Sequence, residues 1–422
     1  MRIAHILRKY DPAEWGGTET AIERLAAGFA GQGVASIVYA PRLAQAVTAV
    51  DPLAAAGCIV RRFRAFVAVW GVPAERKRQM VVAGGNVMSF DLIGALWREP
   101  GLDVIHSHAL GRLGATGRAA ARGRRLPFVL SVHGGAYDLP AAVRQELRKS
   151  AAGGWDWGKP LGLLLRARHL FADSAAIITV NQHEAALIRE RHPNRRVFVQ
   201  PHGVPSALFA EDRRPAAHAA FPALRGRPVL LVLGRIDSTK NQAWLIAEAA
   251  ELVRRHSQIL LVFVGACMNR EYGDALQARI THDGLDDCVL LAGGLPPGDP
   301  RLIGLLQAAR AVVLPSVSET FGIVILEAWA AGTPVISSRT SGGTALVENG
   351  VNGLLFDLEQ PATFHAAVDR LLAQAEQGAQ WGAAGRAKVA AEFDTVVLAS
   401  RMKRLYQELI EEKHAHCNPT RR

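Results

Sequence analysis

Two glutamates eight residues apart mark the segment of the chain whose residue types best suit an anionic ligand. Glu319 stands in a Ser/Glu/Thr/Gly turn after the apolar run 311–314, and Glu327 lies within the apolar run 322–331. The pattern predicts a strand, a turn and then a helix that ends at a Gly-Thr-Pro sequence. The N-terminus of such a helix can bind anions, because its first N–H groups have no partner inside the helix.

The spacing of the two glutamates suits a long ligand. The helical rise would place Glu319 and Glu327 about 10 Å apart. Their carboxylates could therefore contact a sugar and a ribose on either side of a diphosphate. The alternative is that Glu319 caps the helix and that Glu327 is a solvated helix residue. Glu327 has apolar neighbours on both sides, and an acid in such surroundings is more often buried with a partner, which favours the ligand-binding interpretation.

Two cations follow the apolar run 229–233, in the sequence Gly-Arg-Ile-Asp-Ser-Thr-Lys-Asn. The guanidinium of Arg235 could bind a diphosphate through two parallel hydrogen bonds, and the ammonium of Lys240 could bind it as a point charge. The alternative is a pair of ordinary surface cations on a loop between a strand and a helix. Taken alone, the pattern favours this alternative.

In the first half of the chain, a glycine pair and two of the histidines are candidates for ligand binding. Gly16 and Gly17 follow the first predicted strand, where paired glycines let backbone N–H groups approach a phosphate or a sugar. Glycine pairs also serve many ordinary turns. His133 follows the strand predicted over 128–132, and His202 lies near the end of this half. A lone histidine is usually structural or simply exposed.

Several common phosphate-binding motifs are absent from the sequence. There is no Asp-x-Asp pair, no Gly-x-x-x-x-Gly-Lys-Ser/Thr loop and no Gly-x-Gly-x-x-Gly after the first predicted strand. Without the carboxylate pair, the charge of a diphosphate would be met by Arg235, Lys240 and helix N-termini. We therefore expect no metal and no other cofactor. The other two absences argue against an NTPase loop and a dinucleotide fingerprint.

The candidate residues lie between strand-like and helix-like segments that alternate along all 422 residues, which predicts an α/β fold with parallel sheets. This length favours two domains. We predict an N-terminal domain over 1–205, a linker over 206–228 and a C-terminal domain over 229–395. The remainder, 396–422, is predicted to form a helix that packs back on the N-terminal domain and to end in a polar tail. Strands are predicted over 2–7, 36–39, 104–107, 128–132, 176–180, 197–201, 229–234, 259–264, 289–292, 311–314 and 334–337.

The net charge of +11 comes from the first half of the chain. Residues 1–205 contain 27 Lys and Arg against 15 Asp and Glu, a net charge of +12. This imbalance favours an anionic partner for the first half, for which an anionic membrane surface, a phosphorylated acceptor and nucleic acid are the candidates.

Basic and aromatic residues are interleaved in the first half. The segments 61–70 and 75–80 resemble an interfacial membrane segment, and 118–125 adds further arginines; a solvated helix face is an equal alternative. Trp155 and Trp157 could bind a sugar acceptor, and core packing is again an equal alternative. No stretch approaches the roughly 20 apolar residues of a membrane span. We expect a cytoplasmic protein that contacts the inner face of the membrane peripherally.

The segment 316–336 resembles the paired-glutamate motif of the family 4 retaining glycosyltransferases, and the resemblance extends over nearly the whole chain. It implies the GT-B fold, in which two Rossmann-like domains face each other across a cleft. It also implies that Glu319 contacts donor-sugar hydroxyls near the reacting carbon and that Glu327 contacts the ribose hydroxyls. The backbone that would face the diphosphate is that of Thr320, Phe321 and Gly322.

The same resemblance assigns roles to the other candidates. Arg235 and Lys240 would neutralise the leaving diphosphate, and the loop with Gly16 and Gly17 would contact the donor. His133 would orient the donor sugar and the leaving group, with proton transfer as a weaker alternative. The predicted catalytic residues are therefore His133, Arg235, Lys240 and Glu319.

The resemblance implies a retaining, metal-independent hexosyltransferase with a nucleotide-sugar donor of the UDP-glucose or GDP-mannose type. The acceptor would be a glycan or a lipid-linked molecule of surface polysaccharide biosynthesis. One alternative is a nucleotide-sugar epimerase of the same fold. The other is a non-enzymatic protein that binds anionic polymers through the basic first half. We expect no nucleic acid partner, because the sequence has no stacking-platform motif.

Overall fold

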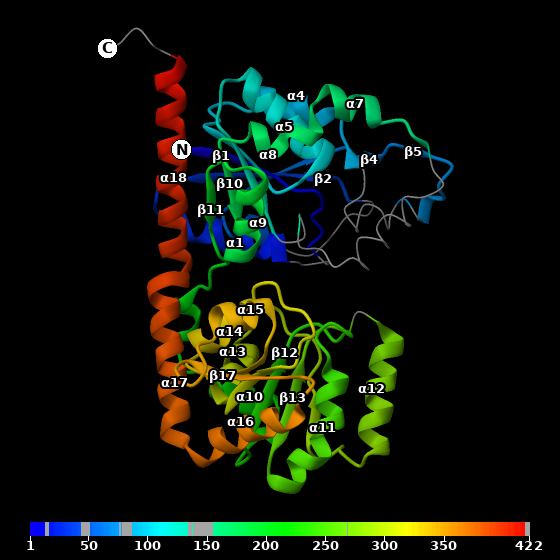
Figure 1. Cartoon of the computed structure of the whole chain (residues 1–422), viewed down its shortest axis with the longest axis vertical. Helices are drawn as coiled ribbons and strands as arrows, with labels where there is room; N and C mark the ends of the chain where they lie inside the picture. Colours follow the sequence, from blue (N-terminus) through cyan, green and yellow to red (C-terminus); the bar gives the residue numbers. More distant parts are fainter. Residues whose placement is uncertain are drawn as a thin grey trace. The chain divides into compact units, whose positions relative to one another are not determined.

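The computed structural model describes residues 1–12, 17–43, 51–75, 77, 87–133, 137, 155–267 and 269–417. The chain divides into two compact units (Figure 1). Unit 1 comprises Met1–Gly203 together with Thr395–Arg422, and unit 2 comprises Val204–Asp394. The chain thus leaves unit 1 once and returns to it with its last helix.

Unit 1 is built on a seven-stranded sheet in which every strand pair is parallel. The strand order is β11-β10-β8-β7-β1-β2-β3. In sheet order these strands span Val197–Val199, Ala176–Thr179, Phe128–Val132, Val104–Ser107, Arg2–Ile6, Ala35–Pro41 and Ile59–Phe63. Apolar residues of the central strands are buried, as in a parallel sheet covered by helices on both faces. The order changes direction between β1 and β7, and ligands of α/β proteins bind at such a switch point, beyond the carboxyl ends of the strands.

Helices cover both faces of this sheet (Figure 1). The helices in the described part of unit 1 include α1 (Gly17–Gly28), α2 (Pro52–Ala55), α4 (Asp91–Arg98), α5 (Gly111–Gly123), α7 (Lys159–Leu164), the 3-10 turn η1 (Ala167–His169), α8 (Leu170–Asp173), α9 (Gln182–Arg191) and α18 (Thr395–Cys417). The last of them, α18, packs against α1, and a Cβ atom on Gly28 would lie only 2.7 Å from the Cβ of Ala399. Met402 and Tyr406 of α18 are buried in the same core cluster as Ile3 of β1.

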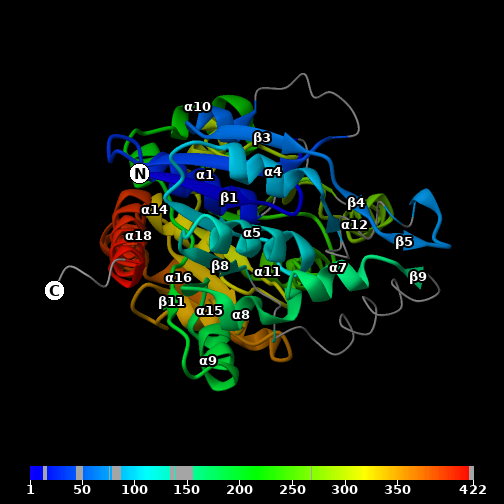
Figure 2. The ribbon, with the colours of Figure 1, turned by 90° about the horizontal axis from the view of Figure 1, so that it is seen from above.

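Two short antiparallel ribbons extend from unit 1. They pair β4 (Phe66–Val67) with β6 (Val87–Met88), and β5 (Val69–Trp70) with β9 (Trp155–Asp156). Figure 2 shows β5 and β9 side by side on the opposite side of unit 1 from α18.

Unit 2 contains a six-stranded parallel sheet with the order β14-β13-β12-β15-β16-β17. In sheet order its strands span Val289–Leu291, Leu260–Val264, Val229–Leu233, Ala311–Leu314, Val335–Ser338 and Gly353–Phe356. Its helices are α10 (Arg214–Ala220), α11 (Gln242–Arg255), α12 (Arg270–His282), α13 (Pro300–Ala308), α14 (Ile323–Ala330), α15 (Ser341–Leu346), α16 (Pro361–Ala373) and α17 (Ala375–Lys388), with 3-10 turns η2 (Ser206–Phe209) and η3 (Pro222–Leu224) and the π-helical turn η4 (Val389–Phe393). Here the order changes direction between β12 and β15, which makes this pair the switch point of unit 2.

The structure differs from the sequence prediction in several segments. Residues 206–228, predicted to be a linker, form η2, α10 and η3 and belong to unit 2, where Phe209, Ala217 and Leu224 enter the core. The basic segment 61–70 contributes to β3 and forms β4 and β5, so the alternative of a solvated helix face is wrong, while the interpretation as an interfacial segment stays a prediction. The sequence prediction also lacked β3, β17 and the short strands β4, β5, β6 and β9. Among the residues that the structure describes, no helix combines the length and the apolar character needed to cross a membrane.

Candidate functional site

In unit 2, the switch point brings together the two charged motifs of the sequence analysis. The loop after β12 carries Lys240 and the loop after β15 carries Glu319, and the Lys240 ammonium forms an ion pair with the Glu319 carboxylate. The side chains are only 19% and 16% exposed, so the pair is largely withdrawn from water. Burying two charges to this extent costs desolvation energy. The presence of the Lys240–Glu319 pair therefore points to a role that needs both charges.

Backbone hydrogen bonds hold the loops around this ion pair together. The amide of Val317 donates to the carbonyl of Thr239 at 2.9 Å, which joins the loops after β15 and β12. The amide of Gly342 and the hydroxyl of Ser341 donate to the carbonyl of Glu319 at 2.7 and 3.0 Å. A Cβ atom on Gly342 would lie 2.8 Å from that carbonyl oxygen, so only glycine allows the first turn of α15 to approach so closely.

Arg235 lies on the same loop as Lys240 but has a different partner. Its guanidinium is 3.2 Å from the carboxylate of Asp237, and its side chain is 60% exposed. The Asp237 carboxylate also accepts hydrogen bonds from the amides of Thr239 and Lys240, both at 3.0 Å, which fixes the turn. Arg235 is therefore accessible to a ligand but is not part of the Lys240–Glu319 pair.

The paired-glutamate segment adopts the predicted strand–turn–helix order. Gly322 has a φ of +85° and directly precedes α14. Glycine adopts this left-handed backbone conformation without the strain that a side chain would cause. Glu327 lies in α14 and is partly buried. Phe321 is buried and Thr320 is exposed. The predicted contacts of these residues with a nucleotide stay predictions.

In unit 1, the switch point carries a group of histidines. His5 on β1 and His106 on β7 are register partners, His108 follows β7, and His133 follows the neighbouring strand β8. Nδ1 of His5 is 3.1 Å from Nε2 of His108, and Nδ1 of His108 is 2.8 Å from Nε2 of His133. His202 stacks on His133 with ring centroids 5.9 Å apart.

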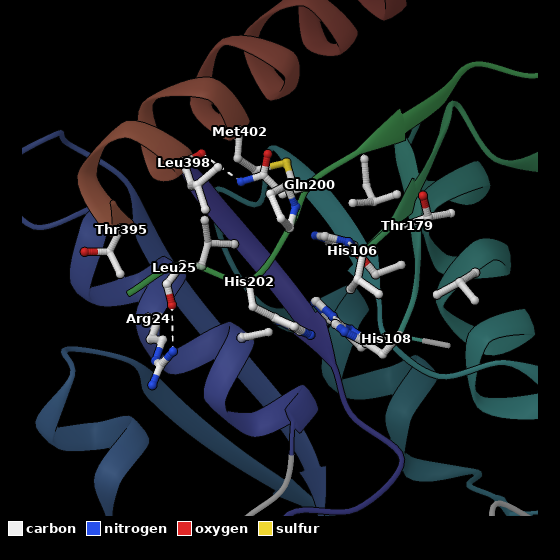
Figure 3. Close-up of a pocket in the computed structure, with 18 residues that line it drawn as sticks. Arg24, Leu25, His106, His108, Thr179, Gln200, His202, Thr395, Leu398 and Met402 are labelled. Atoms are coloured by element: carbon white, nitrogen blue, oxygen red, sulfur yellow. Dashed lines mark hydrogen bonds between the residues drawn. The ribbon is translucent and has the colours of Figure 1, made fainter. Parts of the chain in front are cut away.

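Four of these histidines line a pocket within unit 1 (Figure 3). Figure 3 shows His106, His108 and His202 around it, with Arg24 of α1 on one side and Met402 of α18 on another. The Arg24 guanidinium donates a hydrogen bond to the carbonyl of Gly203 at 2.7 Å, which ties the chain next to His202 to α1. The pocket therefore contains His133, the histidine that the sequence analysis selected, and also residues that it did not select.

Burial keeps the histidine group neutral. Desolvation lowers the pKa of His5 and of His133 from 6.5 to about 4, and that of His202 to about 3. Burial and, secondarily, the neighbouring imidazoles lower the pKa values of His106 and His108 well below the usual range. Near neutral pH all five rings are therefore hydrogen-bonding groups without charge.

The same imidazoles are the one group within the described residues that could hold a metal ion. Ring nitrogens of His5, His106 and His108 all lie within 4.8 Å of one another. Both ring nitrogens of His106 already have partners, however: Nδ1 is 2.6 Å from the Tyr406 hydroxyl, and Nε2 is 2.7 Å from the Ser131 hydroxyl. Binding a metal through His106 would break one of these buried hydrogen bonds.

The remaining predicted site residues of unit 1 lie apart from this group. Gly17 is the exposed first residue of α1, and Gly16 lies outside the described residues. Trp155 is 65% exposed and its ring centroid is 5.2 Å from that of Trp70, while Trp157 stacks on Phe66 at 5.7 Å. The tryptophans thus belong to an aromatic group around the β5–β9 ribbon.

Ion pairs engage part of the basic character of unit 1. Arg118, with a side chain only 8% exposed, is 2.6 Å from the carboxylate of Asp173. Arg64 pairs with Asp91 at 2.8 Å. Arg124 donates a hydrogen bond to the carbonyl of Glu99 at 2.8 Å. The arginines of segment 118–125 therefore do not form one free basic surface.

The neutral histidines predict that the stability of the chain falls in mild acid. In the unfolded chain His5 titrates near 6.5, and in the folded chain near 4, so the unfolded state binds more protons between these pH values. The unfolding free energy should therefore rise with pH across this window, by about 1.4 kcal/mol per pH unit for each such proton. Urea unfolding at several pH values between 4 and 7 measures this slope.

His5→Gln should flatten that slope by about one proton's contribution. The matched control is His183→Gln, since His183 is an exposed residue of α9, and this variant should keep the wild-type slope. Equal slopes in His5→Gln and the wild type would contradict the assignment of His5 as a neutral buried group.

Comparison with known proteins covers both units. The family model described as glycosyl transferases group 1 matches residues 214–388, and the model described as glycosyltransferase family 4 matches residues 15–208. A D-inositol 3-phosphate glycosyltransferase of Frankia alni is 33% identical over 301 residues, which are 68% of this chain and 71% of that protein. A protein of the same name from Acidothermus cellulolyticus is 32% identical over 288 residues, which are 65% of this chain and 61% of that protein.

Solved structures share the fold at lower sequence identity. HepE of Anabaena, solved in complex with UDP and glucose, has a TM-score of 0.69 and 18% identity, and the match covers 97% of this chain and 100% of HepE. Sucrose-phosphate synthase of Thermosynechococcus elongatus has a TM-score of 0.69 and 22% identity, with 97% and 99% of the chains covered. With two parallel α/β units and matches of both family models, the chain has the GT-B fold and belongs to the group 1, family 4 glycosyltransferases.

Proposed function

We propose that the chain is a retaining hexosyltransferase whose nucleotide-sugar donor binds at the switch point of unit 2. The observation that carries the proposal is the Lys240–Glu319 ion pair, which joins two motifs that are 79 residues apart in the sequence. A cation and a carboxylate held side by side match the two ends of a sugar diphosphate, since the phosphates need positive charge and the sugar hydroxyls need acceptors.

Each residue of this site has a proposed task. Lys240 and the exposed Arg235 neutralise the diphosphate, together with the backbone N–H groups at the start of α14. Glu319 binds sugar hydroxyls near the reacting carbon, and Glu327 binds the ribose hydroxyls. Metal independence is part of the proposal, because these cations supply the charge that a metal would otherwise provide.

The donor contacts that the family resemblance implies for His133, Gly16 and Gly17 stay proposals. The reaction breaks the bond between the sugar C1 and the diphosphate oxygen and forms a bond from the acceptor oxygen to C1 on the same face. The acceptor proton passes to an oxygen of the leaving diphosphate, which acts as the base. This course retains the anomeric configuration and needs no enzyme nucleophile.

The acceptor is proposed to carry negative charge. The names of the relatives specify D-inositol 3-phosphate, a phosphorylated polyol, and the first half of this chain carries a net charge of +12. A lipid-linked phosphate of surface polysaccharide biosynthesis would present the same chemistry. UDP is the nucleotide in the solved complex of HepE, and a UDP- or GDP-sugar is proposed as the donor here.

The ribose-binding role of Glu327 can be tested by thermal shift. UDP, GDP, ADP and their sugars are added to the wild type and to Glu327→Ala. A nucleotide that binds the folded state at 100 times its Kd stabilises it by about 2.7 kcal/mol. We expect one nucleotide to raise the Tm of the wild type and to lose most of this effect in Glu327→Ala.

The control for this experiment is Glu376→Ala, which removes an exposed carboxylate from the first turn of α17. It should respond to the nucleotide like the wild type. If Glu327→Ala retains the full wild-type shift, the proposed role of Glu327 is wrong. If no nucleotide shifts the wild type, the donor proposal as a whole loses its support.

Peripheral membrane contact is proposed for the exposed apolar residues near the β5–β9 ribbon. Trp70 and Trp155 are 61% and 65% exposed, and Leu163 and Leu164 of α7 are 76% and 77% exposed. Tryptophan and leucine beside cationic residues suit the boundary between headgroups and acyl chains.

Co-sedimentation with vesicles tests this contact. The wild type should sediment with vesicles that contain anionic lipid, and the double variant Trp70→Ser, Trp155→Ser should bind several-fold more weakly. The exposed Trp97, which lies on α4, provides the control variant Trp97→Ser. If the double variant sediments with the vesicles as strongly as the wild type, the ribbon does not contact the membrane and this proposal is wrong.

A further inference from the structure

Three imidazoles of unit 1 form one continuous hydrogen-bonded chain. His5 contacts His108 through Nδ1 and Nε2 at 3.1 Å, and His108 contacts His133 through Nδ1 and Nε2 at 2.8 Å. The residues come from β1, from the end of β7 and from the end of β8, which lie next to one another in the sheet. His108 therefore uses both of its ring nitrogens within the chain.

Proton counting couples the three rings. A neutral imidazole has one N–H donor and one acceptor nitrogen. His108 must therefore donate to one neighbour and accept from the other. Either His5 donates from Nδ1, so that His108 donates to His133 and the proton of His133 lies on Nδ1, or all three protons lie on Nε2. The tautomers of the three rings can change only together.

The two ends of the chain lie in different surroundings. Nε2 of His5 and Nδ1 of His133 are both buried and have no hydrogen-bond partner among the described residues. His5 is fully buried in the sheet, whereas His133 lines the pocket of unit 1. A buried N–H group without an acceptor is rarer in proteins than an acceptor without a donor. The arrangement with the bare acceptor at His5 places the free N–H on His133, a residue that lines the pocket. The Nδ1 atom itself is covered in this structure, so a hydrogen bond to a ligand oxygen requires the atoms that cover it to move.

We propose that His5 and His108 are positioning residues that hold His133 in its Nδ1–H tautomer, so that His133 donates a hydrogen bond from Nδ1 to an oxygen of the bound substrate. The oxygen is a sugar hydroxyl or a phosphate oxygen, both of which accept an N–H. The identity of the substrate rests on the proposed function, but the tautomer of His133 does not.

The contacts of His106 distinguish a hydrogen-bonded chain of imidazoles from a metal site at the same place. Its two nitrogens bond the Tyr406 and Ser131 hydroxyls at 2.6 and 2.7 Å, so it is not a member of the chain. Its ring lies 4.2 Å from that of His108 between centroids and packs against the chain instead. These contacts favour a hydrogen-bonded chain of imidazoles over a metal bound by His5, His106 and His108.

Nitrogen NMR of the full chain labelled with ¹⁵N-histidine tests the proposal near pH 7.5, because the ring-nitrogen shifts distinguish the two tautomers. The His133 signals are assigned by their loss in His133→Gln. We expect the wild type to carry the His133 proton on Nδ1. His108→Leu breaks both contacts and should shift His133 to a mixture or to the Nε2–H tautomer.

The first ring of the chain offers a matched pair of variants. In His5→Asn the side-chain amide nitrogen takes the place of Nδ1 and can still donate to His108, so the His133 tautomer should be retained, whereas His5→Leu should lose it. Tyr406→Phe removes a hydrogen bond of His106 but none of the chain, and it should leave His133 unchanged. If His108→Leu does not fold, the wild-type tautomer and the His5 pair still decide the question.

Three results would overturn the proposal: a wild-type His133 protonated on Nε2, a His133 signal unchanged in both His108→Leu and His5→Leu, or Zn²⁺ that binds the wild type and perturbs the His5, His106 and His108 signals together. With an active wild type, we also expect His108→Leu to lower kcat/KM by about 10- to 100-fold, as losses of supporting hydrogen bonds around a site do. If the His133 tautomer is as expected but the wild type neither binds nor turns over a nucleotide sugar, the proposed function fails. The hydrogen-bonded arrangement of His5, His108 and His133 then still stands.

Discussion

Both candidate sites depend on the pairing of parallel strands across a switch point. Neighbouring parallel strands end at the same edge of a sheet, so the loops that follow them must lie side by side. In unit 2 this constraint brings the loop after β12 against the loop after β15 and forms the Lys240–Glu319 pair. In unit 1 the same constraint on β1, β7 and β8 aligns His5, His108 and His133.

The two units use this geometry with opposite electrostatics. The site in unit 2 keeps its charges, because Lys240 and Glu319 are paired and partly accessible and Arg235 is largely exposed. The site in unit 1 suppresses charge, since burial lowers the pKa values of its histidines. A charged site suits the diphosphate of the proposed donor, and a neutral one suits the directional hydrogen bonding of hydroxyl groups. This contrast fits a reaction in which charge develops on the leaving group.

The sequence predicted the fold class and most strands because parallel strands covered on both faces are continuous apolar runs. The strand β3 was missed since Arg61 and Arg62 interrupt its apolar pattern, and residues 206–228 were taken for a linker since Pro and Arg conceal the buried Ala217 and Leu224. Composition also overstated the basic surface, because the ion pair that Arg118 forms with Asp173 depends on tertiary structure.

The candidate site was predicted only in part for a related reason. Lys240 and Glu319 were each selected from motifs, but their contact depends on the order of β12 and β15 in the sheet, which a sequence does not state. His5 and His108 were not selected at all, since a histidine after a strand carries no signal until the register of that strand is known. A pattern of histidines near the ends of three strands, His5, His108 and His133, was nevertheless present in the sequence.

Real-time ¹H NMR can follow sugar transfer by the wild type and by Lys240→Met, with UDP- and GDP-sugars as donors and a phosphorylated polyol as acceptor. The wild type should consume one nucleotide sugar without added metal and form a product with the anomeric configuration of the donor. Lys240→Met should be slower by about 100-fold or more, since it removes charge stabilisation from the leaving diphosphate. A product of inverted configuration, or Lys240→Met as fast as the wild type, would contradict these expectations.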